Sequence, residues 1–407
     1  GLVAFVSMAS KYILAINKKH IFNPVAIAIF LATLFGSGIA SWWVGSTTLV
    51  IPVIILGLLI IRKVRRFEMF LAFLIASIIS LFIFNYSDGS KFLEFLKITF
   101  LSGPLFFLGF FMLTEPLTTP PKKKMQIVYG VIVGALLGSS FEYGILYSTP
   151  GFALIVGNIF SYLVSPKARL VLTLIKKNQL TKDIYEFFFK SDQKLDYKPG
   201  QYLEWTLGHE SPDMRGNRRY FTIESSPTEE EIKLGAKFYD NSSSFKKKLL
   251  SMNDGEKIYA SQLSGEFTLP ENPKDKLVFI AGGIGVTPFR SMVKYLVDKK
   301  ERRDIVLFFS NRTPADIVYK DLLDQAEREI GLKVIYAVND LSGSILQDNM
   351  RIGFVNEEMI KKEVPDYAER IFYISGPHVM TTAFETTLSK MGIKSSNIKT
   401  DFFPGFV

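Results

Sequence analysis

The chain has 407 residues, a net charge of +9 and a mean hydropathy of +0.21 although 21% of its residues are charged, which predicts two parts in different solvents. It contains no cysteine, which excludes disulfides, thiolate-bound iron–sulfur clusters and cysteine-ligated zinc within this chain. Of its three histidines only His20 lies in the hydrophobic part, which argues against a membrane haem held by two histidine pairs.

Residues 1–166 are dominated by apolar stretches, and we expect them to form a transmembrane helical domain. Crossing a bilayer takes roughly 20 residues, and backbone groups in lipid must pair within their own segment, so these stretches should be helices. We expect seven spans, near 1–16, 22–42, 46–61, 67–86, 97–114, 126–147 and 150–165. The chain opens with Gly inside an apolar run, and we expect it to lack its natural start, with no signal peptide visible.

Lysine and arginine fall in every second loop of this part, which sets its orientation. The basic residues of those loops are Lys18, Lys19, Arg62, Lys63, Arg65, Arg66, Lys122, Lys123, Lys124 and Lys167. This pattern predicts a multi-pass protein of the inner or cytoplasmic membrane, surrounded by lipid, whose C-terminal module lies in the cytoplasm. Because many basic residues serve this topology, nucleic acid is not an expected partner.

Residues 167–272 read as short strands with turn signals, which favours a small antiparallel β-barrel. One strand carries Arg219, Tyr220, Phe221 and Thr222. A flavin site needs a cation for phosphate, an aromatic plane for the ring and a hydroxyl near the ring nitrogen that receives hydride, and this strand supplies all three. Arg219 and Phe221 should share one face. Such strands are also common in ordinary sheets.

A helix should begin at Ser243 and Ser244. Either serine can cap it, and the free N–H groups of a helix N-terminus suit an anion such as a pyrophosphate. A plain cap explains the same residues equally well.

From residue 273 the pattern changes to strand, glycine turn and helix, which predicts an α/β domain over 273–407. An apolar strand leads into Gly282, Gly283 and Gly285, and Thr287 and Pro288 open a helix. Glycines let the backbone approach a dinucleotide, and the helix N-terminus faces its phosphates. Two further strands end in small or polar residues at the edge where such sheets bind ligands, namely Ser310, Arg312, Ser375, Gly376 and Pro377.

Several motifs in this order resemble the ferredoxin–NADP⁺ reductase superfamily over 168–407. They are PGQY (199–202), RYFT (219–222), GEFTLP (265–270), GGIGVTP (282–288), SNRT (310–313) and SGPHVM (375–380). The resemblance implies an FAD-binding barrel over 167–272 and a Rossmann-like NAD(P)-binding domain over 273–407.

The same resemblance implies roles for single residues. Arg219, Phe221 and Thr222 would bind FAD, and Gly282 to Thr287 would bind the pyrophosphate of NAD(P)H. Ser310 and Arg312 would lie near the adenosine ribose, and Ser375, Gly376 and Pro377 near the nicotinamide, with Thr222 and Ser375 as catalytic residues. Many relatives carry Tyr, Ser and Cys where this chain has Phe221, Thr222 and Ser375. The choice between NADH and NADPH stays open.

The first part resembles the C-terminal half of the RnfD/NqrB family, membrane subunits of ion-pumping electron-transfer complexes that carry flavin. The resembling segments are 22–25, 101–103, 111–116 and 151–158. FMN in the membrane domain is therefore an open possibility, although the only counterpart of the motif that holds flavin covalently is a poor one, Gly45-Ser-Thr-Thr48. An intramembrane carboxylate, Glu115 or Glu142, would mark an ion or cofactor site, unless it lies at headgroup level.

Together these patterns predict a membrane-bound flavoprotein oxidoreductase. Electrons would pass from NAD(P)H through FAD to a membrane acceptor, which would be a quinone, a flavin or a partner subunit. Two alternatives stay open: a subunit in which electron transfer drives ion transport, and a membrane-tethered reductase of a soluble acceptor.

Overall fold

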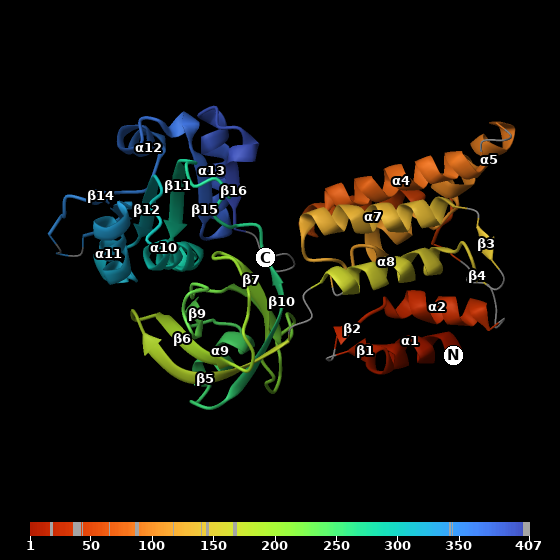
Figure 1. The fold of residues 1–407 in the computed structure, drawn as a ribbon, viewed down its shortest axis with the longest axis horizontal. Coiled ribbons are helices and arrows are strands. Elements are labelled where there is room, and N and C mark those ends of the chain that lie inside the picture. Colours follow the sequence, from red (N-terminus) through yellow and green to blue (C-terminus); the bar gives the residue numbers. More distant parts are fainter. Residues whose placement is uncertain are drawn as a thin grey trace. The chain divides into compact units, whose positions relative to one another are not determined.

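The structure is a computed structural model. It describes residues 1–16, 19–35, 42, 44–64, 66–85, 89–116, 118–139, 141–143, 146–165, 169–341, 343 and 345–401. The chain forms two compact units, Gly1–Lys167 and Ala168–Phe403, which are described separately (Figure 1). Lys18, Arg65 and Lys167 of the basic loops lie outside the described residues.

The first unit is helical. Its helices are α1 (Leu2–Ile13), α2 (Pro24–Leu34), α3 (Val50–Val64), α4 (Phe67–Asn85), α5 (Gly89–Leu101), α6 (Leu105–Phe107), α7 (Lys123–Gly138) and α8 (Pro150–Val164). Among the described residues, one stretch, Phe67–Phe84, is long and apolar enough to cross a membrane, and four other apolar helices are shorter. A helix starts within or close to each expected span. The lengths of α3, α4 and α8 agree with the expected spans to within one residue, whereas the helices of spans 1–16 and 126–147 end earlier, 97–114 is interrupted, and most of the end of 22–42 lies outside the described residues.

Local chemistry explains where the predicted spans break. The expected span 97–114 ends as α5 at Leu101, because Pro104 has no amide hydrogen for a continuous helix, and a π-helical turn, Leu108–Met112, follows α6. The expected span 126–147 ends at Gly138. There the hydroxyls of Ser139 and Ser148 both donate to the carbonyl oxygen of Leu136, each at 2.8 Å. Two short strand pairs complete the unit: β1 (Ala15–Ile16) with β2 (Lys19–His20), and β3 (Glu142–Tyr143) with β4 (Leu146–Tyr147).

Glycines recur at every fourth position of α7 on the side that packs against α4. They are Gly130, Gly134 and Gly138. A Cβ atom on Gly134 would overlap the carbonyl oxygen of Phe73 on α4, and the other two glycines meet α4 backbone oxygens in the same way. Small residues at such spacing let two helix backbones approach closely, which is a common form of packing in membranes.

We expect Gly134→Val to destabilise the first unit by about 1–3 kcal/mol, the usual cost of an overpacked core. The added methyl groups would meet backbone, which cannot rotate away. Thermal unfolding of the full chain in detergent measures the effect. The matched control is Val131→Leu on the exposed side of the same helix, where Val131 is 44% exposed; equal unfolding temperatures for the two variants would contradict the packing argument.

The second unit begins with an antiparallel sheet of strand order β8-β7-β10-β5-β6-β9. The strands are β5 (Leu170–Gln179), β6 (Ile184–Ser191), β7 (Tyr202–Thr206), β8 (Arg218–Thr222), β9 (Ile232–Lys237) and β10 (Lys257–Ser264), with α9 (Ser244–Ser251) following β9. The two ends of the sheet approach each other after β8, where the amide of Glu224 donates to the carbonyl of Lys233 at 3.0 Å. The curved sheet encloses an apolar core that includes Trp205 and Phe245.

A parallel sheet of order β14-β13-β12-β11-β15-β16 follows. Its elements are β11 (Leu277–Gly282), α10 (Thr287–Lys299), β12 (Ile305–Asn311), α11 (Lys320–Ile330), β13 (Lys333–Val338), β14 (Met350–Ile352), α12 (Glu357–Glu363), β15 (Ile371–Ser375), α13 (His378–Lys390) and β16 (Ile398–Thr400). Alternate residues of β11 pack against α10 and α11 on one face and against α12 and α13 on the other (Figure 1). This is the three-layer α/β arrangement expected from the sequence.

Candidate functional site

A cavity of about 1150 Å³ lies in the second unit, at the carboxyl ends of the parallel strands. Parallel pairing brings the ends of three strands to one level, because Gly282 of β11 pairs with Ser310 of β12 and Ala281 pairs with Ser375 of β15. Residues of the antiparallel sheet line the opposite side of the cavity. The volume and the position suit an extended dinucleotide.

The three glycines of the turn after β11 each have a steric reason to be glycine. Gly283 adopts a positive φ of 52°. A Cβ atom on Gly285 would lie 2.5 Å from the carbonyl oxygen of Ser375, and one on Gly282 would overlap the sulfur of Met380. Met380 therefore covers the end of β11, a contact that the sequence pattern did not indicate.

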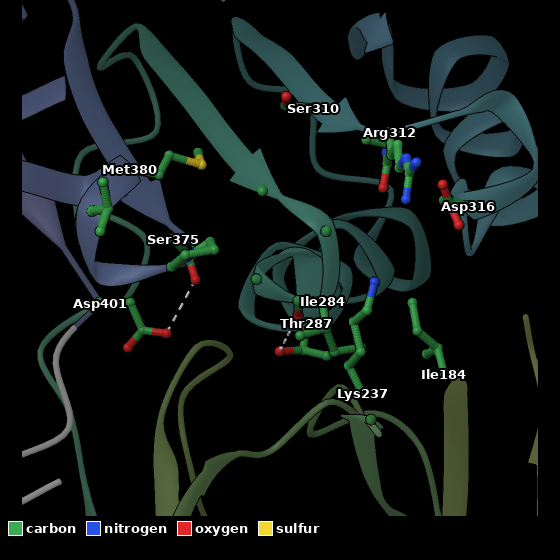
Figure 2. A pocket seen from close by; sticks show the side chains of 18 of the residues that line it. Ile184, Lys237, Ile284, Thr287, Ser310, Arg312, Asp316, Ser375, Met380 and Asp401 are labelled. Atoms are coloured by element: carbon green, nitrogen blue, oxygen red, sulfur yellow. Dashed lines mark hydrogen bonds between the residues drawn. The ribbon is translucent and has the colours of Figure 1, made fainter. Parts of the chain in front are cut away.

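The helix α10 begins at this turn. A 3₁₀ turn, Gly283–Val286, leads into Thr287, whose hydroxyl donates to the carbonyl of Ile284 at 3.2 Å. Thr287 lines the cavity, so the N-terminus of α10 lies at the cavity wall (Figure 2). Pro288 is buried within the first turn of the helix. A helix start of this kind stabilises phosphate groups.

The two ends of the cavity differ in chemistry. Figure 2 shows Ser375 with Asp401 at one end, where the Ser375 hydroxyl donates to Asp401 at 3.2 Å, and Arg312 with Asp316 at the other. Asp316 closes a capping box with Thr313, accepting from its amide at 3.0 Å. Sequence reasoning missed Asp401 and Asp316, because carboxylates distant from a glycine motif carry no local signal.

The antiparallel sheet contributes Tyr220, Phe221 and Thr222 to the cavity. The Tyr220 hydroxyl donates to Glu204 on β7 at 3.0 Å, which fixes its ring. The Phe221 ring lies 5.8 Å from the ring of Phe245 on α9. Thr222 is 7% exposed. An aromatic ring and a hydroxyl from one strand therefore face the same space as the turn after β11.

Arg219 does not line this cavity. Its guanidinium donates to both carboxylate oxygens of Asp213, at 2.9 and 3.1 Å, and to carbonyls of its own loop. The Asp213 carboxylate also accepts from the amide of Ser244 at 3.2 Å, at the start of α9. Although burial opposes it, hydrogen bonding from the amide of Arg215 and the charge of Arg219 hold the pKa of Asp213 below its usual value. Arg219 and the α9 N-terminus thus form one arrangement that holds the carboxylate of Asp213.

Two lysines join this arrangement to the cavity. Lys246 of α9 lines the cavity and donates to the carbonyl of Lys237, which also lines it, at 2.7 Å. Burial, and then the charges of Arg215 and Arg219, lower the pKa of Lys246. Lys237 is paired with Asp183 at 2.9 Å, and Arg215 and Arg219 share the carboxylate of Asp213, so Lys246 adds a positive charge that a diphosphate would balance. The sequence pattern did not single out Lys246.

The predicted residues thus divide into two groups. Those that line the cavity are Tyr220, Phe221, Thr222, Gly282, Gly283, Gly285, Thr287, Ser310, Arg312, Ser375, Gly376 and Pro377. Those that do not are Arg219, Ser243, Ser244 and Pro288. Ser243 caps α9 by accepting from the amide of Lys246, so the plain-cap interpretation describes its observed contact.

A second polar cluster lies in the first unit, where three of the segments that carry the RnfD/NqrB resemblance meet. The side-chain amide of Asn23 donates to Glu115 at 2.8 Å, and the backbone N–H of Asn23 donates to the side-chain oxygen of Asn158 at 2.7 Å. Asn158 donates to the hydroxyl of Tyr129 at 3.0 Å, and Thr118 donates to Glu115 at 3.2 Å. Glu115 is therefore held at the partly buried end of a hydrogen-bond network that ties together α2, α7, α8 and the loop after the π-helical turn.

The other candidates of the first unit lie elsewhere. Glu142 is exposed on the short strand β3. Ser46 and Thr48, from the segment compared with the covalent-flavin motif, hydrogen bond to each other at 3.1 Å in an exposed turn.

Comparisons with known proteins match both parts of the chain. Residues 5–169 match the NQR2, RnfD, RnfE family, and residues 279–386 match the oxidoreductase NAD-binding domain. Both resemblances expected from the sequence are thereby confirmed.

Curated relatives match the second part. The stachydrine N-demethylase reductase subunit of Rhizobium meliloti is 27% identical over 54% of this chain and 62% of its own length. The glycine betaine monooxygenase reductase subunit of Chromohalobacter salexigens is 27% identical over 56% of this chain and 62% of its own length. The chain thus spans less than two thirds of these relatives.

Solved structures share the fold. The flavohemoglobin of Malassezia yamatoensis, with bound FAD and heme, has a TM-score of 0.54 and 18% identity, over 86% of this chain and 98% of that one. The flavohem-like FAD/NAD binding domain of the nitric oxide dioxygenase of Vibrio cholerae has a TM-score of 0.50 and 16% identity, over 57% and 98% of the two chains.

Proposed function

We propose that this chain, which joins a segment of the NQR2, RnfD, RnfE type to a module whose homologues are ferredoxin-reductase-like, is a flavin-dependent NAD(P)H oxidoreductase of a membrane. The observation that carries the proposal is the shared cavity. The strand of Phe221 and Thr222 and the glycine turn of Gly282 to Thr287 line one space, as transfer between two bound cofactors requires.

The residues present fit a flavin dinucleotide. In the proposed site Phe221 packs against the flavin ring, and Thr222 hydrogen bonds to it from the buried strand. Lys246, Arg219 and the amides at the start of α9 hold the diphosphate, with Arg219 released from Asp213 when phosphate takes its place. The flavin, when bound, accepts hydride and passes electrons on singly or in pairs.

The nicotinamide nucleotide would take the other side of the cavity. Its pyrophosphate fits the N-terminus of α10 at Thr287, and its adenosine end fits beside Ser310 and Arg312. Ser375 then lies beside the nicotinamide with Gly376 and Pro377, and its bond to Asp401 orients the hydroxyl. Under this proposal the barrel comprises 167–272 and the nucleotide domain 273–407.

For the first unit we propose a multi-pass arrangement in the cytoplasmic membrane, with the reductase module in the cytoplasm. Exposed apolar side chains along α3 and α4, such as Ile55, Leu59, Ile79 and Ile83, support a lipid-facing surface. The electron acceptor is then a quinone, a membrane flavin or a partner subunit. FMN in this unit stays a lesser proposal, because the segment of Ser46 and Thr48 is a poor counterpart of the covalent-flavin motif. The hydroxyls of these two residues hydrogen bond to each other.

The family of residues 5–169 favours a second candidate, in which electron transfer drives ion transport. A turnover rate that requires Na⁺ would support it, and turnover independent of Na⁺ and of a proton gradient would contradict it. If the detached module, 168–407, reduces the acceptor as fast as the full chain does, the first unit serves only as a tether.

The proposed function predicts that the full chain, purified in detergent and supplied with FAD, has a flavin absorbance band that bleaches on anaerobic addition of NADH or NADPH. The nucleotide that bleaches the band faster identifies the donor. Flavin that stays on the protein after acid precipitation would reveal covalent FMN. A chain that binds no flavin after reconstitution would contradict the proposal.

A further inference from the structure

A pair of buried carboxyl groups lies next to the cavity and takes no part in the site described above. Glu224 follows β8 and is completely buried, and Glu186 on β6 is 7% exposed. Glu186 pairs across the sheet with Gly235 of β9. Neither carboxylate oxygen of Glu224 makes a well-formed hydrogen bond among the described residues, although the Tyr319 hydroxyl and Arg290 Nε lie close to it.

Two ionised carboxylates cannot satisfy each other, because both only accept hydrogen bonds. Glu186 lies within side-chain hydrogen-bond reach of Glu224. Complete burial, and then the neighbouring Glu186, raise the pKa of Glu224 well above its ordinary value. The Tyr319 hydroxyl can donate to one oxygen of Glu224, and a proton on one of the two carboxyl groups supplies the donor between them.

The charges around Glu186 and Glu224 also favour one proton on the pair. Arg290 of α10 donates to Glu229 and lies with its Nε 3.7 Å from Glu224, and Lys233 of β9 bonds to Glu229 at 2.8 Å. Burial opposes the ionisation of Glu229, but Arg290 outweighs it and holds the pKa of Glu229 at about 2. Arg290 thus faces both Glu229 and the pair, while Lys233 faces Glu229, so these five groups have no net charge only when the pair carries one proton.

The pair lies directly behind the cavity wall. Gly235 and Thr287 both line the cavity. A Cβ atom on Gly235 would lie 2.6 Å from Glu224 Oε2 and 2.9 Å from both Thr287 Cγ2 and the hydroxyl of Tyr319. Burial, and then Glu224, raise the pKa of Tyr319 well above its ordinary value, so its phenol adds no negative charge.

We propose that Glu186 and Glu224 share one proton in the native protein, and that the resulting neutral pair, behind Gly235 and Thr287, allows a nucleotide phosphate to bind at the start of α10. The second half rests on the proposed function. An additional buried negative charge at this place would oppose the phosphate and offset the favourable helix N-terminus. Loss of the shared proton should therefore weaken nucleotide binding.

Infrared spectroscopy of the full chain at neutral pH tests the first half. The protonated carboxyl band of the wild type, identified by its shift in heavy water, should disappear in both Glu224→Gln and Glu186→Gln, because either amide supplies the donor and removes one charge. Glu230→Gln, an exposed neighbour, is the matched control and should keep the band. A wild-type spectrum that differs from both variants only in carboxylate bands would overturn the shared proton.

Stability gives a second measure. Above the ordinary glutamate value of about 4.3 the unfolded chain has released the proton that the folded chain retains. The stability of the wild type should therefore fall relative to Glu224→Gln as the pH rises from there through the raised folded value. A constant difference between the two proteins across this range would contradict the shared proton.

Titration with NADH tests the second half. The wild-type dissociation constant should rise, on the order of tenfold, as the pH rises through the loss of the shared proton, since one charge acts on another across a strand, while that of Glu224→Gln should stay constant. If the wild-type affinity for NADH stays constant over the pH range in which the infrared band is lost, the shared proton has no effect on nucleotide binding and the second half of the proposal is wrong. If the wild type binds neither FAD nor NADH, the proposed function fails, while the infrared result still decides the proton.

Discussion

Gly285→Ala is expected to lower the rate at which NAD(P)H bleaches the flavin by on the order of a hundredfold, since a displacement of about 1 Å at a transfer site has effects of this size. The new Cβ atom would lie 2.5 Å from the carbonyl oxygen of Ser375, 2.6 Å from its carbonyl carbon and 2.7 Å from the Cα of Gly376. All three are backbone atoms of the strand end beside the proposed nicotinamide position. The turn and the strand end must therefore move apart.

Stopped-flow absorbance at saturating FAD measures this rate, and the flavin content of the purified variant shows whether the barrel is intact. The matched control is Gly331→Ala at the end of α11, where φ is +75° and a Cβ atom has open space. That change should cost about 1 kcal/mol of stability and leave the rate unchanged. Equal rates for Gly285→Ala and the wild type would contradict the steric argument.

Lys246→Met is expected to weaken FAD binding by about tenfold or more, the value of one hydrogen bond to a charged group. Methionine keeps the length of the side chain and removes its charge. Because Lys246 adds to the positive charge of Arg215 and Arg219, its loss should also reduce the salt dependence of FAD binding. Fluorescence titration of the deflavinated full chain with FAD measures both effects.

Lys247→Met is the control on the same helix, because Lys247 is exposed and does not line the cavity. It should bind FAD as the wild type does. If both variants lose affinity equally, general surface charge explains the effect. If neither does, the proposed diphosphate position beside α9 is wrong. At saturating FAD, NADH should reduce the flavin of Lys246→Met at the wild-type rate, because in this proposal Lys246 contacts FAD and not NADH.

Much of the fold and site followed from local sequence. The strand, glycine turn and helix over 276–299 could be predicted because each residue type restricts its own backbone, and the structure places β11, the turn and α10 there. The position of Ser310 and Ser375 at the same edge of the sheet could be predicted, because the carboxyl ends of parallel strands meet at one edge. The roles of these residues in binding FAD and NAD(P)H stay predictions.

Helix lengths in the first unit were predicted less well. Hydrophobicity locates an apolar stretch, but it does not say where the backbone stops being helical. Pro104 and the serine hydroxyls that hydrogen bond to the carbonyl of Leu136 mark places where helices end inside the expected spans. Of the described residues, one stretch, Phe67–Phe84, reaches the length of a membrane span.

The order of the two parts, the glycine turn and the strand of Arg219 to Thr222 could be predicted, because each depends on contiguous residues. The folded chain was needed to show that Asp213 holds Arg219, that Asp401 accepts from Ser375, and that Glu186 and Glu224 lie together behind Gly235. Contacts of this kind join residues that are far apart in the sequence, and no local sequence pattern indicates them. Their charges interact strongly because burial removes water, and burial is a property of the folded chain alone.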